Sequence, residues 1–214
     1  MTRRRVVPAA FLAAACQTSS GVGQGTDTGD PVEVGFFVTS QGSGNGGDLG
    51  GLAGADARCQ ELATAAGLPA RDWRAYLSAT GPIHARDRIG AGPWLNAVGT
   101  IVAADLDALA AGVASEDMLD EFGDPAGKDP PPGAEHDILT GSDLDGRLHS
   151  SEATCADWTS NRREDRVVVG HHDWGQLSND QWTQSWISVH SAPCDTEGMA
   201  AQLGAARTYC FAAD

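Results

Sequence analysis

The distribution of apolar and polar residues divides the chain near residue 32. Residues 17–31 are rich in Gly, Ser and Thr and have no apolar periodicity, so we predict a flexible tether there. Residues 32–39 are apolar and rich in β-branched and aromatic side chains, which favours a strand. Over residues 52–66 apolar side chains recur at helical spacing, and Gly67 is placed to end that helix. The folded part is therefore predicted to begin with a strand followed by a helix.

Beyond this helix, short apolar segments alternate with long polar loops, and a glycine-rich loop precedes the helix at residues 41–51. This pattern is typical of an α+β fold. We predict short mixed or antiparallel strands, one early helix and a loop-rich second half. The segments expected as strands after the helix are 73–78, 138–140, 167–169, 186–189 and 207–211.

One stretch inside the predicted domain 32–214 differs in composition from the rest. Residues 112–137 are acidic and contain three consecutive prolines, Pro130 to Pro132. Proline runs and acidic loops interrupt regular structure. We therefore predict a mobile surface insertion, with only a short helical piece near residues 118–122.

The N-terminus has the features of a bacterial export signal. Arg3 to Arg5 precede the mostly apolar residues 6–15, a run too short to span a bilayer, which takes about 20 residues. Residues 12–16 resemble a lipobox, whose cysteine is lipidated after the signal is removed, although Ala13 stands where lipoboxes usually carry leucine. We expect residues 1–15 to be the signal and Cys16 to be the lipid anchor, with plain secretion as the alternative. Gln17 after the cysteine permits an outer-membrane location.

The cysteine count supports export. If Cys16 is lipidated, four cysteines remain, and an even number in an oxidising compartment predicts two disulfides. Their spacing leaves three pairings open, and no pair has the close spacing of a zinc-binding Cys-x-x-Cys motif. The remaining cysteines are Cys59, Cys155, Cys194 and Cys210.

A resemblance to a known family is carried, in chain order, by residues 37–40, 51–59, 73–78, 139–147, 154–159, 185–194 and 209–212. These segments resemble the endostatin domain of collagens and bacterial lipoproteins with an endostatin-like domain. The resemblance covers residues 34–213, and implies a C-type lectin-like fold with nested disulfides Cys59–Cys210 and Cys155–Cys194. The zinc-binding N-terminal histidines of endostatin have no counterparts in this chain.

The charge balance narrows the range of partners. The chain has 14 Lys+Arg against 29 Asp+Glu, a formal net charge of −15, and removal of residues 1–15 with their three arginines makes it −18. A surface this negative repels phosphate backbones, so nucleic acid is not an expected partner. It also places the heparin-binding arginines of endostatin in doubt.

The second half of the chain holds the candidate ligand-binding residues. They lie between Cys155 and Cys194, where lectin-like folds form the long loops that carry ligand sites. Exposed tryptophans can stack on sugar faces, and Asn or Asp can hold hydroxyl groups or a cation, whereas Trp158 and Trp186 are expected in the core. The candidates are His171, His172, Asp173, Trp174, Asn179, Asp180, Trp182 and His190.

Calcium is the only cofactor that the sequence raises as a hypothesis. Asp143, Asp145 and Glu152 match positions 3, 5 and 12 of a calcium-binding loop that starts at Gly141. The first position should be Asp, and the endostatin resemblance instead implies a hairpin turn in this segment. A glycine pattern at residues 42–47 lacks the helix start that a phosphate-binding loop needs, so it is interpreted as a surface loop.

No catalytic motif is found. His190 and Ser191 are adjacent in a predicted extended segment, so their side chains point to opposite faces and do not form a nucleophile–base pair. The sequence therefore predicts a lipid-anchored cell-envelope protein that binds a carbohydrate or an extracellular or matrix protein, without catalysis. The alternative is an exported hydrolase or calcium-dependent enzyme, which would require a convergent acid–base pair.

Overall fold

The computed structural model describes residues 33–127, 135–174 and 185–214. The predicted signal (1–15), Cys16 and the tether up to residue 31 lie outside these residues. The fold is α+β, as predicted, and is built on one mixed sheet with β5 parallel to β8 and the other neighbours antiparallel. The sheet runs in the order β1 (Phe36–Val38), β8 (Gly204–Ala212), β5 (Asp137–Leu139), β6 (Arg166–His171) and β7 (His190–Pro193).

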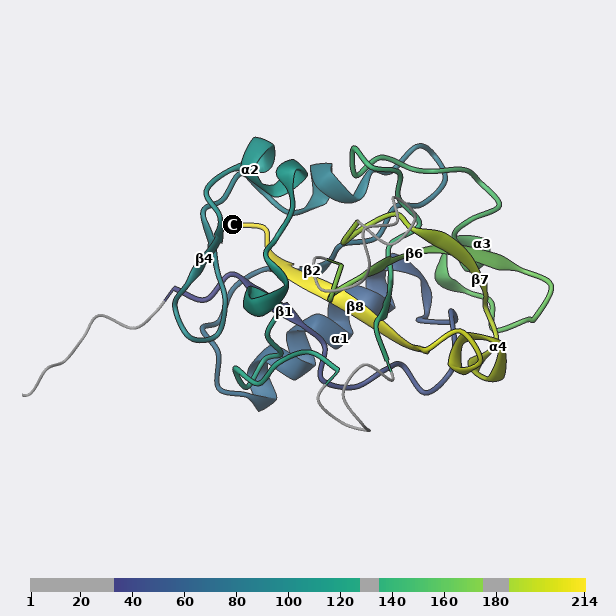
Figure 1. The fold of residues 1–214 in the computed structure, drawn as a ribbon, viewed down its shortest axis with the longest axis horizontal. Helices are drawn as coiled ribbons and strands as arrows, with labels where there is room; N and C mark the ends of the chain where they lie inside the picture. The colour runs from purple at the N-terminus through teal and green to yellow at the C-terminus, as the bar shows by residue number, and fades with distance from the viewer. Residues whose placement is uncertain (1–32, 128–134, 175–184) are drawn as a thin grey trace, which may run out of the picture. The chain divides into compact units, whose positions relative to one another are not determined.

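Two further pairings complete the strand arrangement. Strand β2 (Trp73–Ala75) also pairs with β8 in antiparallel fashion. A separate hairpin is formed by β3 (Trp94–Leu95) and β4 (Ile101–Ala103). Strands β1, β2 and β5 thus all pair with β8, and Figure 1 shows β8 crossing the centre of the domain.

Alternation along β8 supplies two hydrophobic cores, one on each face of the sheet. Cys210 and Ala212 belong to the core that also contains residues of α1, whereas Tyr209 and Phe211 belong to the other core. Successive side chains of a strand point to opposite faces, so a strand covered on both sides is apolar at every position. This explains the uninterrupted apolar character of residues 209–212.

The early helix is confirmed as α1 (Gly51–Ala65), one residue earlier than predicted at each end. Ala55, Cys59 and Ala63 are its buried positions. Gly67 has a φ of 73°, the left-handed conformation that ends helices and that glycine adopts without steric cost.

Short helices also occur later in the chain, in addition to the one early helix that was predicted. Helix α2 (Leu106–Ala111) and helix α4 (Thr196–Ala200) each start at an aspartate, Asp105 and Asp195, whose side chain accepts a backbone N–H of the first turn. Both helices are too short to show a clear periodicity. The other short helical segments are η1 (Ala85–Arg88), η2 (Ser115–Asp117) and α3 (Cys155–Trp158).

Both disulfides are present with the pairing that the endostatin resemblance implies. Cys59–Cys210 joins α1 to β8, and Cys155–Cys194 joins α3 to the end of β7. The glycine loop packs against the second disulfide, since a Cβ on Gly47 would lie 2.2 Å from Cys155 Sγ. Two disulfides suit an oxidising compartment outside the cytoplasm. Within the described residues, no helix is long and apolar enough to cross a membrane.

Some predicted strands have different bounds in the structure. The strand at 32–39 is regular only over Phe36–Val38. The prediction of a strand at 186–189 is wrong, because β7 begins at His190. The physical reason is a turn in which Ser185 Oγ accepts the backbone N–H groups of Ile187 and Ser188, at 3.2 and 3.0 Å.

The predicted insertion at 112–137 is only partly at the surface. Val113 and Met118 are fully buried in the core next to α2, and Asp137 begins β5. The helical piece expected at 118–122 is wrong, because the chain forms η2 just before it and then a tight turn. Residues 128–134, with the three prolines, lie outside the described residues.

Candidate functional site

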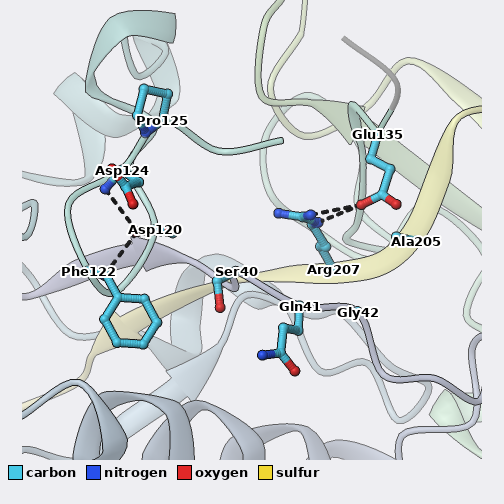
Figure 2. Close-up of a pocket in the computed structure, with 10 residues that line it drawn as sticks. All are labelled: Ser40, Gln41, Gly42, Asp120, Phe122, Asp124, Pro125, Glu135, Ala205 and Arg207. Atoms are coloured by element: carbon cyan, nitrogen blue, oxygen red, sulfur yellow. Dashed lines mark hydrogen bonds and ion pairs between the residues drawn. The ribbon is translucent and has the colours of Figure 1, made fainter. Parts of the chain in front are cut away.

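The structure brings together two groups of functional side chains. The first group lines a cavity of about 500 Å3, which is drawn in Figure 2. The second is a cluster of histidines and aspartates where β5, β6 and β7 meet.

Within the described part of the chain, four separate segments line the cavity. Residues 40–42 follow β1, residues 120–125 form a turn, Glu135 precedes β5, and Ala205 and Arg207 belong to β8. Figure 2 shows Phe122 on one side and Glu135 with Arg207 on the other, with Ser40 and Gln41 between them. The described residues that line the cavity are Ser40, Gln41, Gly42, Asp120, Phe122, Asp124, Pro125, Glu135, Ala205 and Arg207.

The turn at 120–125 holds Phe122 out toward solvent. Asp120 Oδ1 accepts the backbone N–H groups of Phe122 and Asp124, each at 2.9 Å. Gly123 has a φ of 86°, so the turn needs glycine at this position. As a result the Phe122 side chain is exposed, with 62% of the residue's surface accessible. Burial is the main cause that raises the pKa of Asp120 above its usual value.

A charged pair, Arg207 and Glu135, lies on the side of the cavity opposite Phe122. The Arg207 guanidinium donates to Glu135 Oε2 from Nη2 at 2.7 Å and from Nε at 3.2 Å. Between the two sides, Ser40 donates to the buried carboxylate of Glu121 through both its backbone N–H and its hydroxyl. Among the residues that the structure describes, the cavity wall therefore carries three carboxylates, those of Asp120, Asp124 and Glu135, and one guanidinium, that of Arg207.

The histidine and aspartate cluster is centred on Asp137. The Oδ1 atom of Asp137 lies 3.1 Å from His171 Nε2, 3.4 Å from His190 Nε2 and 3.5 Å from His136 Nε2. The Nε2 atoms of His171 and His190 are 3.2 Å apart. Asp173 lies at the far side of His136, with 3.5 Å between its Oδ1 and His136 Nδ1.

The charges in this cluster act on one another. Burial on its own raises the pKa of Asp137, but the His171 and His190 rings reverse this effect and hold the pKa below its usual value. Asp173 raises the pKa of His136, and Asp137 raises the pKa of His190. These shifts favour the ionised form of Asp137 and the protonated forms of His136 and His190.

Of the predicted ligand-binding residues, His171, Asp173 and His190 come together in this cluster. His171 and His172 are buried, and His171 is the last residue of β6 instead of part of a long loop. His172 turns away from the cluster to the backbone oxygen of Glu135, at 3.1 Å, and burial lowers its pKa. The Trp174 indole donates to Val113 O at 2.7 Å. The other predicted residues, Asn179, Asp180 and Trp182, lie outside the described residues.

The candidate calcium ligands occupy a hairpin turn. Asp143 Oδ1 accepts the backbone N–H groups of Asp145 and Arg147, each at 2.9 Å, and Ser142 pairs with Leu148. Among the described residues, Asp143, Asp145 and Glu152 do not form a group of ligand atoms close enough to share an ion. Trp158 and Trp186 are buried core residues, as predicted.

Several residues of both groups were missed by sequence reasoning. Asp137 and His136 stand at the end of the acidic stretch, where a carboxylate looks like part of a solvated loop. Their signal was the run of apolar residues directly after Asp137, which indicates a strand that buries its first residue. The cavity residues gave no signal, because they come from four distant segments.

Comparison of the chain with protein-family models finds no match, and comparison with curated proteins finds none either.

Proposed function

We propose that this chain is an exported, non-catalytic binding protein that takes a neutral carbohydrate in the cavity beside Phe122. The observation that carries the proposal is an exposed aromatic ring on the wall of a polar cavity of about 500 Å3. Small-molecule sites usually measure roughly 300–1,000 Å3, so the cavity matches a sugar residue or short glycan better than a broad protein surface.

The chemistry of the walls supports a neutral, hydroxyl-rich ligand. The face of Phe122 offers the negative side of its quadrupole to the polarised C–H groups of a sugar ring. The exposed Gln41 carboxamide offers a donor and an acceptor for hydroxyl groups, and the carboxylates of Asp120, Asp124 and Glu135 offer acceptors. Within the described lining, three carboxylates and one guanidinium disfavour an anionic ligand such as a sulfated glycan.

The proposal also covers the fold of the domain and its location in the cell. The nested pairs Cys59–Cys210 and Cys155–Cys194 support a C-type lectin-like, endostatin-like fold. The lipobox-like segment that ends at Cys16 supports a lipid anchor in the bacterial cell envelope, at the outer membrane or cell surface. An anchored domain on a flexible tether can reach ligands away from the membrane.

Side-by-side arrays test this proposal. The purified protein is applied to a glycan array that includes neutral, sialylated and sulfated glycans, and to an array of extracellular-matrix proteins. We expect binding to a set of neutral glycans that free sugar competes away. Binding to matrix proteins after enzymatic deglycosylation, with no glycan bound, would contradict the carbohydrate assignment.

A further inference from the structure

Three adjacent strands place ligand-type side chains on one face of the sheet. Asp137 of β5 is directly opposite His171 of β6, and His190 of β7 is opposite Val169, two residues before His171. Directly opposed residues share a face, and so do residues two apart along a strand. The side chains of Asp137, His171 and His190 therefore converge as a consequence of strand register.

The distances among the three side chains are those of metal ligands. Asp137 Oδ1, His171 Nε2 and His190 Nε2 form a triangle with sides of 3.1, 3.2 and 3.4 Å. Zinc binds N and O ligands at about 2.0–2.1 Å in a tetrahedron, which separates the ligand atoms by about 3.3 Å. The two imidazole planes meet at 68°, so lone pairs in the ring planes can point at a common centre.

The carboxylate of Asp137 is buried with imidazole nitrogens within 3.5 Å but without a hydrogen bond in good geometry from the described residues. Its side chain is 2% exposed, and neither oxygen has a hydrogen-bond donor in good geometry within the described part of the chain. A buried carboxylate without a partner is strongly destabilising. A proton on one ring would stabilise only one of the three contacts in the triangle. A cation at the centre of the triangle would contact all three ligand atoms.

His136 borders the centre without joining it. Its ring is stacked on that of His171 at 4.1 Å, with an angle of 13° between the planes. The in-plane lone pairs of two parallel rings run side by side, so they do not converge on one ion. His136 instead contacts Asp173, as ligands and neighbouring groups of metal centres commonly contact a carboxylate.

We infer that Asp137, His171 and His190 bind a divalent transition metal of the zinc class. Two imidazoles and one carboxylate suit Zn²⁺, whereas Mg²⁺ and Ca²⁺ prefer oxygen ligands alone. Three protein ligands leave one coordination position, and the His190 side chain, 37% exposed, is the solvent-facing ligand of the three. This site is separate from the proposed carbohydrate cavity and does not depend on it.

Calorimetric titration of the untagged, chelator-treated protein with ZnCl2 tests the inference. We expect one Zn²⁺ per chain with a dissociation constant in the micromolar range or tighter, a higher melting temperature with zinc, and no heat with CaCl2 or MgCl2. Co²⁺ in place of Zn²⁺ should give the intense visible absorption of a tetrahedral or five-coordinate site. Absence of zinc binding, or a weak octahedral Co²⁺ spectrum, would overturn the inference.

Two matched histidine variants locate the metal. His190→Gln removes the half-exposed ligand and is expected to weaken zinc binding at least about tenfold. His149→Gln removes an exposed histidine outside the cluster and should bind zinc like the parent. Near-ultraviolet circular dichroism verifies the fold of both. Equal zinc affinity in His190→Gln and the parent protein would show that the metal binds elsewhere.

Discussion

At the scale of single residues, α3 has the longest run of left-handed φ values among the described residues. Four consecutive residues from Cys155 to Trp158 have φ values between 49° and 67°. This left-handed conformation costs about 1–2 kcal/mol per residue that is not glycine. The disulfide at Cys155, the buried Trp158 ring and the bond from its indole to Ser78 O at 2.9 Å hold the turn in place.

Asp157 is the polar anchor of this turn. Its carboxylate accepts the backbone N–H of Thr80 at 2.8 Å, the Thr80 hydroxyl and the Thr154 hydroxyl. Burial raises the pKa of Asp157, but these hydrogen bonds outweigh it and lower the pKa below its usual value. Because the pKa is lower in the folded state, this stabilisation exists above the unfolded pKa of about 4 and is lost as pH falls through the folded pKa.

Asp157→Asn should therefore destabilise the protein in a pH-dependent way. Asparagine tolerates the left-handed conformation, so the change mainly removes the charge. We expect a loss of about 1 kcal/mol in the free energy of unfolding at pH 7, since the site is partly solvent-screened, and a much smaller loss near about pH 2. Urea unfolding at both pH values measures it, with exposed Asp145→Asn as the control. Equal losses at both pH values would contradict the role given to the charge.

At the scale of elements, the disulfides hold parts that are far apart in sequence. Cys59–Cys210 spans 151 residues and Cys155–Cys194 spans 39. In the chain-entropy model a longer closed loop gives a larger stabilisation, about 5 kcal/mol for the first bond and about 4 kcal/mol for the second. The first disulfide thus links the early helix α1 to the central strand β8 covalently.

Removing each disulfide separately should show that Cys59–Cys210 stabilises the protein more than Cys155–Cys194 does. The double variant Cys59→Ala with Cys210→Ala is expected to lose about 1 kcal/mol more in the free energy of unfolding than Cys155→Ala with Cys194→Ala. Urea unfolding under oxidising conditions compares the two with the parent protein. A larger loss for the second pair would show that local packing at α3 outweighs loop closure.

Sequence patterns predicted the elements that are long or periodic. Helix α1 was predictable because its apolar positions and Gly67 agree, and the cysteine pairing followed from the endostatin resemblance. Helices α2 and α4 were not, because five or six residues give no periodicity. Asp137 was missed because an acid next to an acidic loop looks solvated, although the apolar run after it indicated a strand, and the structure shows it buried where β5 pairs with β6.

At the scale of the whole molecule, both candidate sites arise from the sheet and not from one contiguous motif. The cavity joins the end of β1 to β8 and to the turn that carries Phe122, and the metal ligands come from β5, β6 and β7. The net charge of −15 adds a long-range field that repels anions and attracts cations. That field agrees with a neutral ligand in the cavity and a cation at Asp137.

The most direct measurement of carbohydrate binding in the cavity compares two exposed apolar residues. Calorimetric titration with the best glycan from the array is repeated for Phe122→Ala and for Ile101→Ala, whose side chain is 58% exposed on β4 outside the cavity lining. Loss of the stacking ring should weaken binding by about tenfold or more, whereas Ile101→Ala should bind like the parent protein. Parent-like affinity in Phe122→Ala would contradict the placement of the ligand in this cavity.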